Sequence, residues 1–215
     1  MARPRGCART PPLDVPAGAV ARAAAMNVAE VFRRITAALD QAGISYMLTG
    51  SFASAYYGVP RSSQDIDLVI EATPARLQRF IQLLPSAEYY ADLETALEAQ
   101  QRQSLFNVID LLTGWKIDFI FRKSRPFSRQ EFDRRQQIVL QGFSIFAASA
   151  EDVVVAKLEW AQRAQSQRHI DDVAGILRMR WDSLDHAYLE KWILELGLPA
   201  EWKDARHAAD RWFDC

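Results

Sequence analysis

The sequence predicts an α+β (α/β) fold, in which a short mixed β-sheet flanked by helices is followed by a C-terminal helical bundle. Two observations lead to this prediction. Strand-like and helix-like patterns alternate between residues 27 and 148, whereas only helical patterns follow residue 149. The tryptophans at positions 160, 181, 192, 202 and 212 all lie in the later part, which predicts a helical layer with its own core.

The composition is that of an ordinary globular protein, with 215 residues of which 49% are hydrophobic and 25% charged. It excludes disordered, collagen-like and disulfide-scaffold proteins. Because 26 basic and 27 acidic side chains leave a net charge of -1, any polyanion must bind at a local site. We interpret Cys7 and Cys215 as free thiols in a reducing cytosol. No apolar run is long enough to span a membrane, so we expect a cytoplasmic protein with no membrane partner.

Three segments are expected along the chain: a leader over 1–25, a mixed domain over 26–148 and a helical domain over 149–215. The leader contains several prolines and arginines but few large apolar side chains, which indicates disorder or a start codon assigned too early. Met26 is followed by a regular helical pattern, which favours the second interpretation.

The first elements are predicted from apolar spacing and capping residues. Asn27 and Glu30 have the spacing of a capping box, and a helical pattern then continues to Gly43. The elements expected next are a strand over 46–49, a helix over 52–57, a strand over 65–70, a helix from Pro74 that includes Leu84, and a helix over 93–105.

A hairpin is expected to follow, with strands over 108–112 and 115–121 around Thr113–Gly114. A charged helix after Pro126 and two short strands around Gln141–Gly142 complete the mixed part. Ser149 and Asp152 have the Ser-x-x-Asp form of a cap, which predicts the start of the helical part.

Gly50 and Ser51 lie between a predicted strand and a predicted helix. Unpaired backbone N–H groups and the positive end of the helix dipole favour phosphate oxygens at such a position. Glycine allows a ligand to approach the backbone closely, and the serine hydroxyl adds a donor.

Asp65 and Asp67 lie two residues apart on one strand, so their side chains share a face with Cα atoms roughly 6.6 Å apart. Two carboxylates beside apolar residues are unfavourable without compensation. A divalent cation such as Mg²⁺ compensates them and retains substrate phosphates as further ligands. A third acid would allow two metal ions to be held.

Asp118 is the preferred third acid, with Asp110 as its rival. A two-residue turn at Thr113–Gly114 would place Ile109 opposite Asp118, so that the two acids face opposite sides of the sheet. A three-residue turn would place both on one face, so hairpin geometry narrows the choice without deciding it.

Three motifs together resemble the polymerase-β-like nucleotidyltransferase superfamily, and most closely its AbiEii-type toxin-like and related minimal members. They are Gly50–Ser51 at a helix start, Arg-x-Ser-x-Asp-Ile-Asp-Leu over 61–68 and Lys-Ile-Asp-Phe over 116–119. The resemblance implies a nucleotidyltransferase fold in which Asp65 and Asp67 bind two Mg²⁺ ions, with Mn²⁺ as a substitute. It also implies that Asp118 binds one ion and helps to deprotonate the attacking hydroxyl.

The same resemblance extends into the helical part. It implies that Lys157, in an acid-x-x-x-x-Lys element that begins at Asp152, neutralises nucleotide phosphate. It implies that Asp172 orients this lysine or a substrate group. In the commoner pattern a Lys-Asp pair stands where His169 aligns, so Asp171 remains an alternative to Asp172.

Plainer roles are open for several of these residues. Arg61 either contacts phosphate or pairs with an acid, and Lys157 without the resemblance would be a solvated helix lysine. The three histidines show no metal-ligand spacing and are interpreted as surface or capping residues, and the tryptophans as core. The pairs Ser124–Arg125 and Arg134–Arg135 are a basic rim or, by default, a solvated face.

The sequence thus predicts a Mg²⁺-dependent enzyme that transfers a nucleoside monophosphate from a nucleoside triphosphate to a hydroxyl and releases pyrophosphate. The acceptor is left open among tRNA, a protein and a small molecule. The resemblance implies the toxin of a toxin–antitoxin or abortive-infection system, with a cognate partner. The alternatives are a catalytically silent nucleotide-binding antitoxin or regulatory partner and, less favoured, a structural module that uses the tryptophan-rich helices.

Overall fold

The computed structural model describes the backbone of residues 17–211 and the side chains of residues 28–211. The predictions for residues 1–16, including Cys7, and for Trp212 and Cys215 lie outside the described residues.

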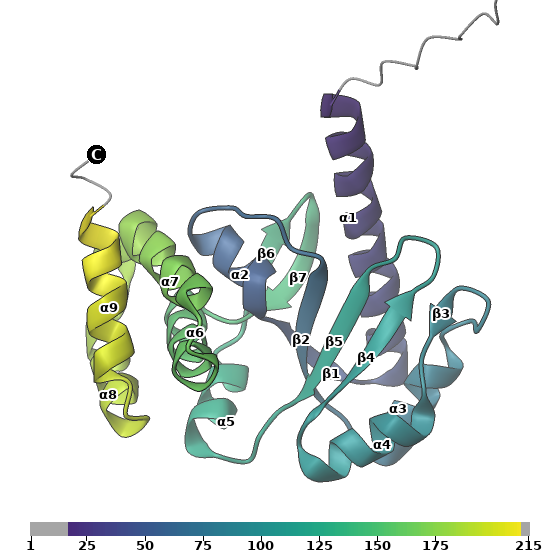
Figure 1. Ribbon diagram of the computed structural model, residues 1–215. Coiled ribbons are helices and arrows are strands. Elements are labelled where there is room, and N and C mark those ends of the chain that lie inside the picture. Colours follow the sequence, from purple (N-terminus) through teal and green to yellow (C-terminus); the bar gives the residue numbers. More distant parts are fainter. Residues whose placement is uncertain (1–16, 212–215) are drawn as a thin grey trace, which may run out of the picture.

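The described strands form one mixed sheet in the order β3-β4-β5-β2-β1-β7-β6 (Figure 1). The pairs β1–β7 and β2–β5 are parallel, and the other neighbouring pairs are antiparallel. The strands are β1 (Ser45–Leu48), β2 (Asp65–Glu71), β3 (Tyr89–Tyr90), β4 (Leu105–Asp110), β5 (Lys116–Phe121), β6 (Gln136–Leu140) and β7 (Phe143–Ala147). The predicted mixed sheet with flanking helices is therefore confirmed.

Helices cover the sheet and form the end of the described chain. They are α1 (Ala17–Ala42), α2 (Gly50–Tyr57), α3 (Pro74–Gln82), α4 (Leu93–Arg102), α5 (Pro126–Asp133), α6 (Ala150–Ala164), α7 (Gln167–Arg180), α8 (His186–Glu195) and α9 (Pro199–Asp210), with a short 3-10 turn at Trp181–Ser183. Helix α2 packs against β2, α6 and α7, and so joins the sheet to the C-terminal helices. In Figure 1, α6–α9 lie at one side of the molecule and α3 and α4 at the other.

Of two helix starts predicted from capping residues, one is observed and the other is not. Ser149 caps α6 as predicted, because its side chain accepts the N–H of Asp152. The capping box at Asn27 is wrong, since α1 begins at Ala17 and Asn27 lies inside it. Residues 17–25 of the expected leader are therefore continuous with α1.

The turn of the β4–β5 hairpin is longer than either the two-residue or the three-residue turn that the sequence left open, because β4 ends at Asp110 and β5 begins at Lys116. Asn107 pairs with Asp118 and Ile109 with Lys116, so the register is displaced by two residues from that of a two-residue turn. The carboxylate of Asp110 accepts the N–H groups of Leu112 and Thr113 and thereby stabilises a longer turn. A displacement by an even number of residues leaves every side chain on its expected face.

The C-terminal helices do not have a core separate from the sheet. The buried apolar side chains form one connected cluster that runs from Val28 in α1 to Ala209 in α9. Trp192 is buried within it, but Trp160 and Trp181 are 47% and 40% exposed, so the prediction that the tryptophans are core residues is wrong for these two. The last strand ends at Ala147, and every described element after it is helical.

Candidate active site

Gly50 is the first residue of α2, and any side chain there would clash with Asp67. Its φ of +64° lies in the left-handed region, and a Cβ atom there would lie 2.0 Å from Oδ2 of Asp67. The backbone N–H of Ser51 hydrogen-bonds to Asp67, and the Ser51 hydroxyl donates to Ser63 at 2.6 Å. The sequence predicted that this N–H and this hydroxyl would face a phosphate, whereas in the structure they bind residues of the site itself.

Asp65, Asp67 and Asp118 converge because β2 and β5 are parallel neighbours. Asp67 lies directly opposite Asp118 in the register, and Asp65 lies two residues before Asp67 on the same face. Burial and the negative charge of Asp118 raise the pKa of Asp67 above its usual value. The opposite face of β2 carries Ile66 and Leu68, which are fully buried in the core and hold the strand in place.

Asp110 does not take part in this convergence. It is fully buried and forms a 2.6 Å ion pair with Arg34 of α1, besides holding the hairpin turn. The observed register differs by two residues from the one that a two-residue turn would give. The side chains of Asp110 and Asp118 therefore lie on opposite faces of the sheet, as that turn would also have placed them. Asp118 instead accepts hydrogen bonds from Asn107 at 2.8 Å and Lys116 at 3.0 Å.

A cationic group faces these acids from α6 and the loop before β2. Asp172 of α7 accepts hydrogen bonds from Nε and a terminal nitrogen of Arg61, at 2.7 and 2.9 Å. It also accepts one from Nζ of Lys157 at 2.6 Å. Burial would raise the pKa of Asp172, but the hydrogen bonds from the two cations outweigh it and lower the pKa. Burial lowers the pKa of Lys157, and its bond to Asp172 opposes that effect.

The structure also separates the two neighbouring aspartates of α7. Asp171 is exposed and bonds to Gln167, one turn earlier on the same helix. Asp172, with only 5% of its side chain exposed, is the one that holds Arg61 and Lys157.

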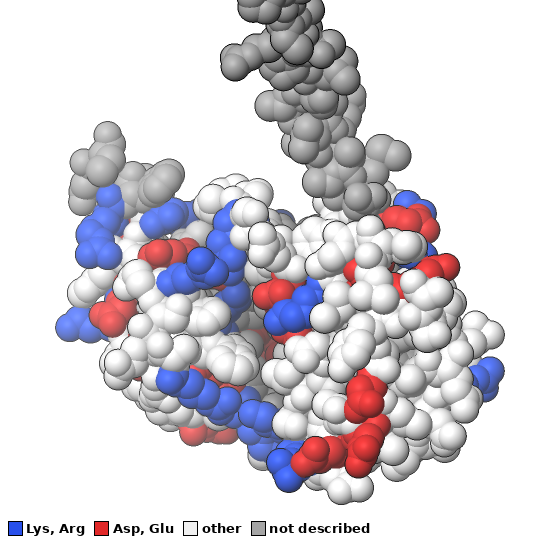
Figure 2. Space-filling model, turned by 45° about the vertical axis from the view of Figure 1, so that its right-hand side comes forward, with Lys and Arg blue, Asp and Glu red and all other residues white. Residues whose placement is uncertain are grey.

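The acids and the cations line one cleft of about 370 Å³ between the sheet and helices α6 and α7. Asp65, Asp67 and Asp118 lie on the sheet side. The other side is formed by residues that include Lys157, Trp160, Arg168 and His169. Figure 2 shows acidic and basic side chains meeting in a hollow on this face of the molecule. The cleft can therefore take a ligand that carries anionic and apolar parts.

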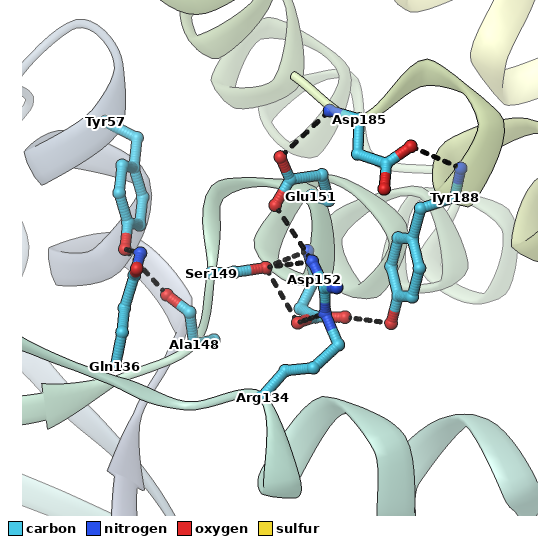
Figure 3. A network of polar contacts seen from close by, with 9 residues as sticks. All are labelled: Tyr57, Arg134, Gln136, Ala148, Ser149, Glu151, Asp152, Asp185 and Tyr188. Carbon is cyan, nitrogen blue, oxygen red and sulfur yellow. Dashed lines mark hydrogen bonds and ion pairs between the residues drawn. The ribbon is translucent and has the colours of Figure 1, made fainter. Parts of the chain in front are cut away.

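A buried polar network fixes the start of α6 and hence the position of Lys157 (Figure 3). Asp152 accepts hydrogen bonds from Ser149, Tyr188 and Arg134. Burial raises the pKa of Asp152, and these hydrogen bonds counteract the increase. Asp152 is thus an anchor of α6, whereas Lys157, five residues later, lies in the cleft.

Comparison with known proteins identifies the family. The family model "Nucleotidyl transferase AbiEii toxin, Type IV TA system" matches residues 33–198. The chain belongs to this family. A search of curated proteins gives no match.

Two solved structures match most of this chain at low sequence identity. ANT(2")-Ia in complex with adenylyl-2"-tobramycin is 13% identical, with a TM-score of 0.46 and coverage of 85% of this chain and 97% of that one. An antigenic nucleotidyltransferase-like protein from Paracoccidioides brasiliensis is 18% identical, with a TM-score of 0.44 and coverage of 82% and 89%.

Membership of the AbiEii family makes this protein a nucleotidyltransferase of the toxin type. It supports the predicted enzyme over the silent antitoxin and over the structural module. Among the described residues, no helix is both long and apolar enough to cross a membrane.

Sequence reasoning missed several residues of the AbiEii-family cleft. His169 lines the cleft, where burial and then the charge of Lys157 lower its pKa, so its interpretation as an ordinary surface or capping residue is wrong. Trp160 also lines the cleft, which explains why its side chain is exposed. The strand alternation that places Asp118 on the active face places Lys116 there too, so that signal was available in the sequence.

The donor chemistry of the three aspartates fits a hard divalent cation, because carboxylate oxygens are its preferred ligands. The three carboxylates share one face of β2 and β5, and burial together with the negative charge of Asp118 raises the pKa of Asp67. Within the part of the chain that the structure describes, however, no three His, Cys, Asp or Glu side chains are already grouped around one ion position. The ammonium of Lys116 lies between Asp65 and Asp118 instead, at 3.4 and 3.0 Å.

Proposed function

We propose that this AbiEii-family enzyme transfers a nucleoside monophosphate from a nucleoside triphosphate to a hydroxyl acceptor and releases pyrophosphate, with Mg²⁺ or Mn²⁺ as cofactor. One observation carries the proposal: three carboxylates on the sheet face a fixed pair of cations across a single cleft. That arrangement suits a substrate whose phosphates are bound by metal on one side and by protein cations on the other.

Asp65, Asp67 and Asp118 would hold two divalent cations. When bound, these ions would neutralise phosphate charge and increase the acidity of the acceptor hydroxyl. The carboxylate of Asp118 would accept the proton of that hydroxyl, which is the role that the family resemblance implies for the acid on β5. The acceptor oxygen then attacks the α-phosphorus, and pyrophosphate leaves.

Arg61 and Lys157 would neutralise the triphosphate, and Asp172 would orient both. Their ion pairs hold the cations in place before the substrate arrives, so little reorganisation is needed during transfer. Gly50 and Ser51 would contribute to the nucleotide site, where both line the cleft. The N–H of Ser51 also hydrogen-bonds to Asp67, and the absence of a side chain at Gly50 leaves room for this carboxylate.

The enzyme would consist of two parts, and each part would form one side of the active-site cleft. The catalytic part over 26–148 carries the acids, and the helical part over 149–215 carries Lys157 and Asp172. A cognate antitoxin is the expected partner in the cell, as the family description implies.

The direct test is transfer of label from each α-labelled nucleoside triphosphate to the components of a cell lysate, with Mg²⁺ or Mn²⁺. We expect the Asp65→Asn/Asp67→Asn variant to lose at least about 100-fold of the rate, and Asp171→Asn, a change at an exposed aspartate, to retain it. Transfer that persists in the double variant would refute the proposed site. Label in RNA, in protein or in small molecules would identify the acceptor class.

A further inference from the structure

Lys116 is part of a four-residue group on the active face of the sheet. In the parallel register of β2 and β5, Asp65 is opposite Lys116 and Asp67 is opposite Asp118. Because residues two apart on a strand share a face, the four side chains form a rectangle of three carboxylates and one ammonium. The backbone register itself therefore places a lysine among the proposed metal ligands.

The ammonium contacts two of the three acids. Its Nζ atom lies 3.0 Å from Oδ2 of Asp118 and 3.4 Å from Oδ1 of Asp65. Both distances are within the range of an ion pair, so one ammonium bridges the two carboxylates. About 40% of the lysine side chain is exposed, and its long flexible stem allows the ammonium to turn toward solvent.

A divalent cation and this ammonium compete for the same oxygens. The acids cannot be left without a counter-ion at low cost, because three carboxylates share one face of two neighbouring strands. An ion that binds Asp65 and Asp118 must displace Lys116, and the two cations then repel each other. The anion that a nucleotide brings into the cleft is the natural new partner for the displaced ammonium.

We propose that Lys116 is a built-in counter-ion that occupies the place of a divalent cation between Asp65 and Asp118 in the free enzyme, and that its release couples metal binding to nucleotide binding. The inference rests on the proposed function, since it assumes that the acids hold metal. Lys116 is a positioning residue in this scheme. It weakens metal binding to the empty enzyme and strengthens it when a triphosphate is present.

The test measures Mn²⁺ binding directly, from the electron paramagnetic resonance signal of free Mn²⁺, with and without a non-hydrolysable nucleoside triphosphate analogue. In the absence of nucleotide, we expect Lys116→Met to bind Mn²⁺ more tightly by on the order of tenfold. Lys116→Arg keeps the charge and should remain close to the wild type. Lys203→Met, on the exposed surface of α9, is the matched control for loss of a lysine.

A second measurement uses the coupling between ligands and the stability of the protein. The analogue should tighten Mn²⁺ binding more in the wild type than in Lys116→Met, and the variant without metal should melt at a lower temperature because its carboxylates lack a counter-ion. If Lys116→Met folds poorly, the same titrations on Lys116→Gln replace it.

The outcomes separate the inference from the function on which it rests. Mn²⁺ binding that is equally tight in wild type and Lys116→Met, with equal coupling to the analogue, overturns the role of Lys116 and leaves metal-dependent transfer intact. Absence of Mn²⁺ binding in both proteins, with or without the analogue, overturns both.

Discussion

The substitution Glu131→Gln should make the free energy of unfolding much less dependent on pH. Glu131 lies in α5 and is only 7% exposed. Burial, followed by repulsion from Asp152, raises its pKa from 4.5 to about 8, although Arg125 and Lys123 partly oppose this effect and Glu159 adds to it. The folded protein therefore retains a proton on Glu131 at pH values where the unfolded chain has released it.

The sign and size of the effect follow from this difference. A raised carboxyl pKa gives stability that is fully present below pH 4.5 and is lost as the pH rises toward 8. The interval spans roughly 3.5 pH units at about 1.4 kcal/mol each, or about 5 kcal/mol in total. That is a large part of the free energy of unfolding of a typical protein, which is about 5–15 kcal/mol.

Urea unfolding of wild type and Glu131→Gln at several pH values measures the effect. We expect the free energies of unfolding to agree within about 1 kcal/mol at pH 5 and the variant to be more stable by about 4–5 kcal/mol at pH 8.5. Glu190→Gln, at an exposed position in α8, controls for the loss of a carboxylate. A difference between wild type and Glu131→Gln that is constant with pH would refute the reasoning.

Three further changes test the packing of the site. Gly50→Ala should lower the free energy of unfolding by more than about 2 kcal/mol, because the new Cβ would meet Asp67; Gly142→Ala, with a φ of +84° and no atom within 4 Å, should lose only about 1 kcal/mol. Equal losses in denaturant unfolding would contradict the proposed clash. Asp172→Ala should cost about 3–5 kcal/mol, because it leaves buried Lys157 without its counter-ion, whereas Asp171→Ala should stay within about 0.5 kcal/mol; similar melting temperatures would argue against this. Asp67→Asn should lose transfer but melt at a higher temperature without metal at pH 7, because the raised pKa makes the charged carboxyl destabilising. A lower melting temperature would show that the carboxylate is compensated.

The hairpin illustrates how a local prediction can be wrong in detail and right in consequence. Neither the two-residue nor the three-residue turn is present in the described chain, because the carboxylate of Asp110 stabilises a longer one. The displacement of the register by two residues nevertheless preserved the faces, so Asp118 and not Asp110 joined Asp67. The prediction of a helix start at Asn27 was wrong, because a local capping pattern does not prevent a helix from starting earlier. Helix α1 begins at Ala17.

The helical part shows the limits of composition. A concentration of tryptophans indicated a separate core, but composition does not say which face of a helix is covered. Trp192 faces the shared core, whereas Trp160 faces the cleft, because α6 turns one side toward the sheet acids.

The sequence by itself determined the local chemistry of this protein. Strand periodicity placed Asp65 and Asp67 on one face, the Ser149 cap began α6, and the spacing of the motifs indicated the family. Only the tertiary structure decided which strands are neighbours and in what register, and hence that Lys116 lies opposite Asp65 and that Asp172 holds Arg61 and Lys157. The physical reason is that periodicity is a property of one segment, whereas these contacts join segments whose proximity depends on the packing of the whole chain.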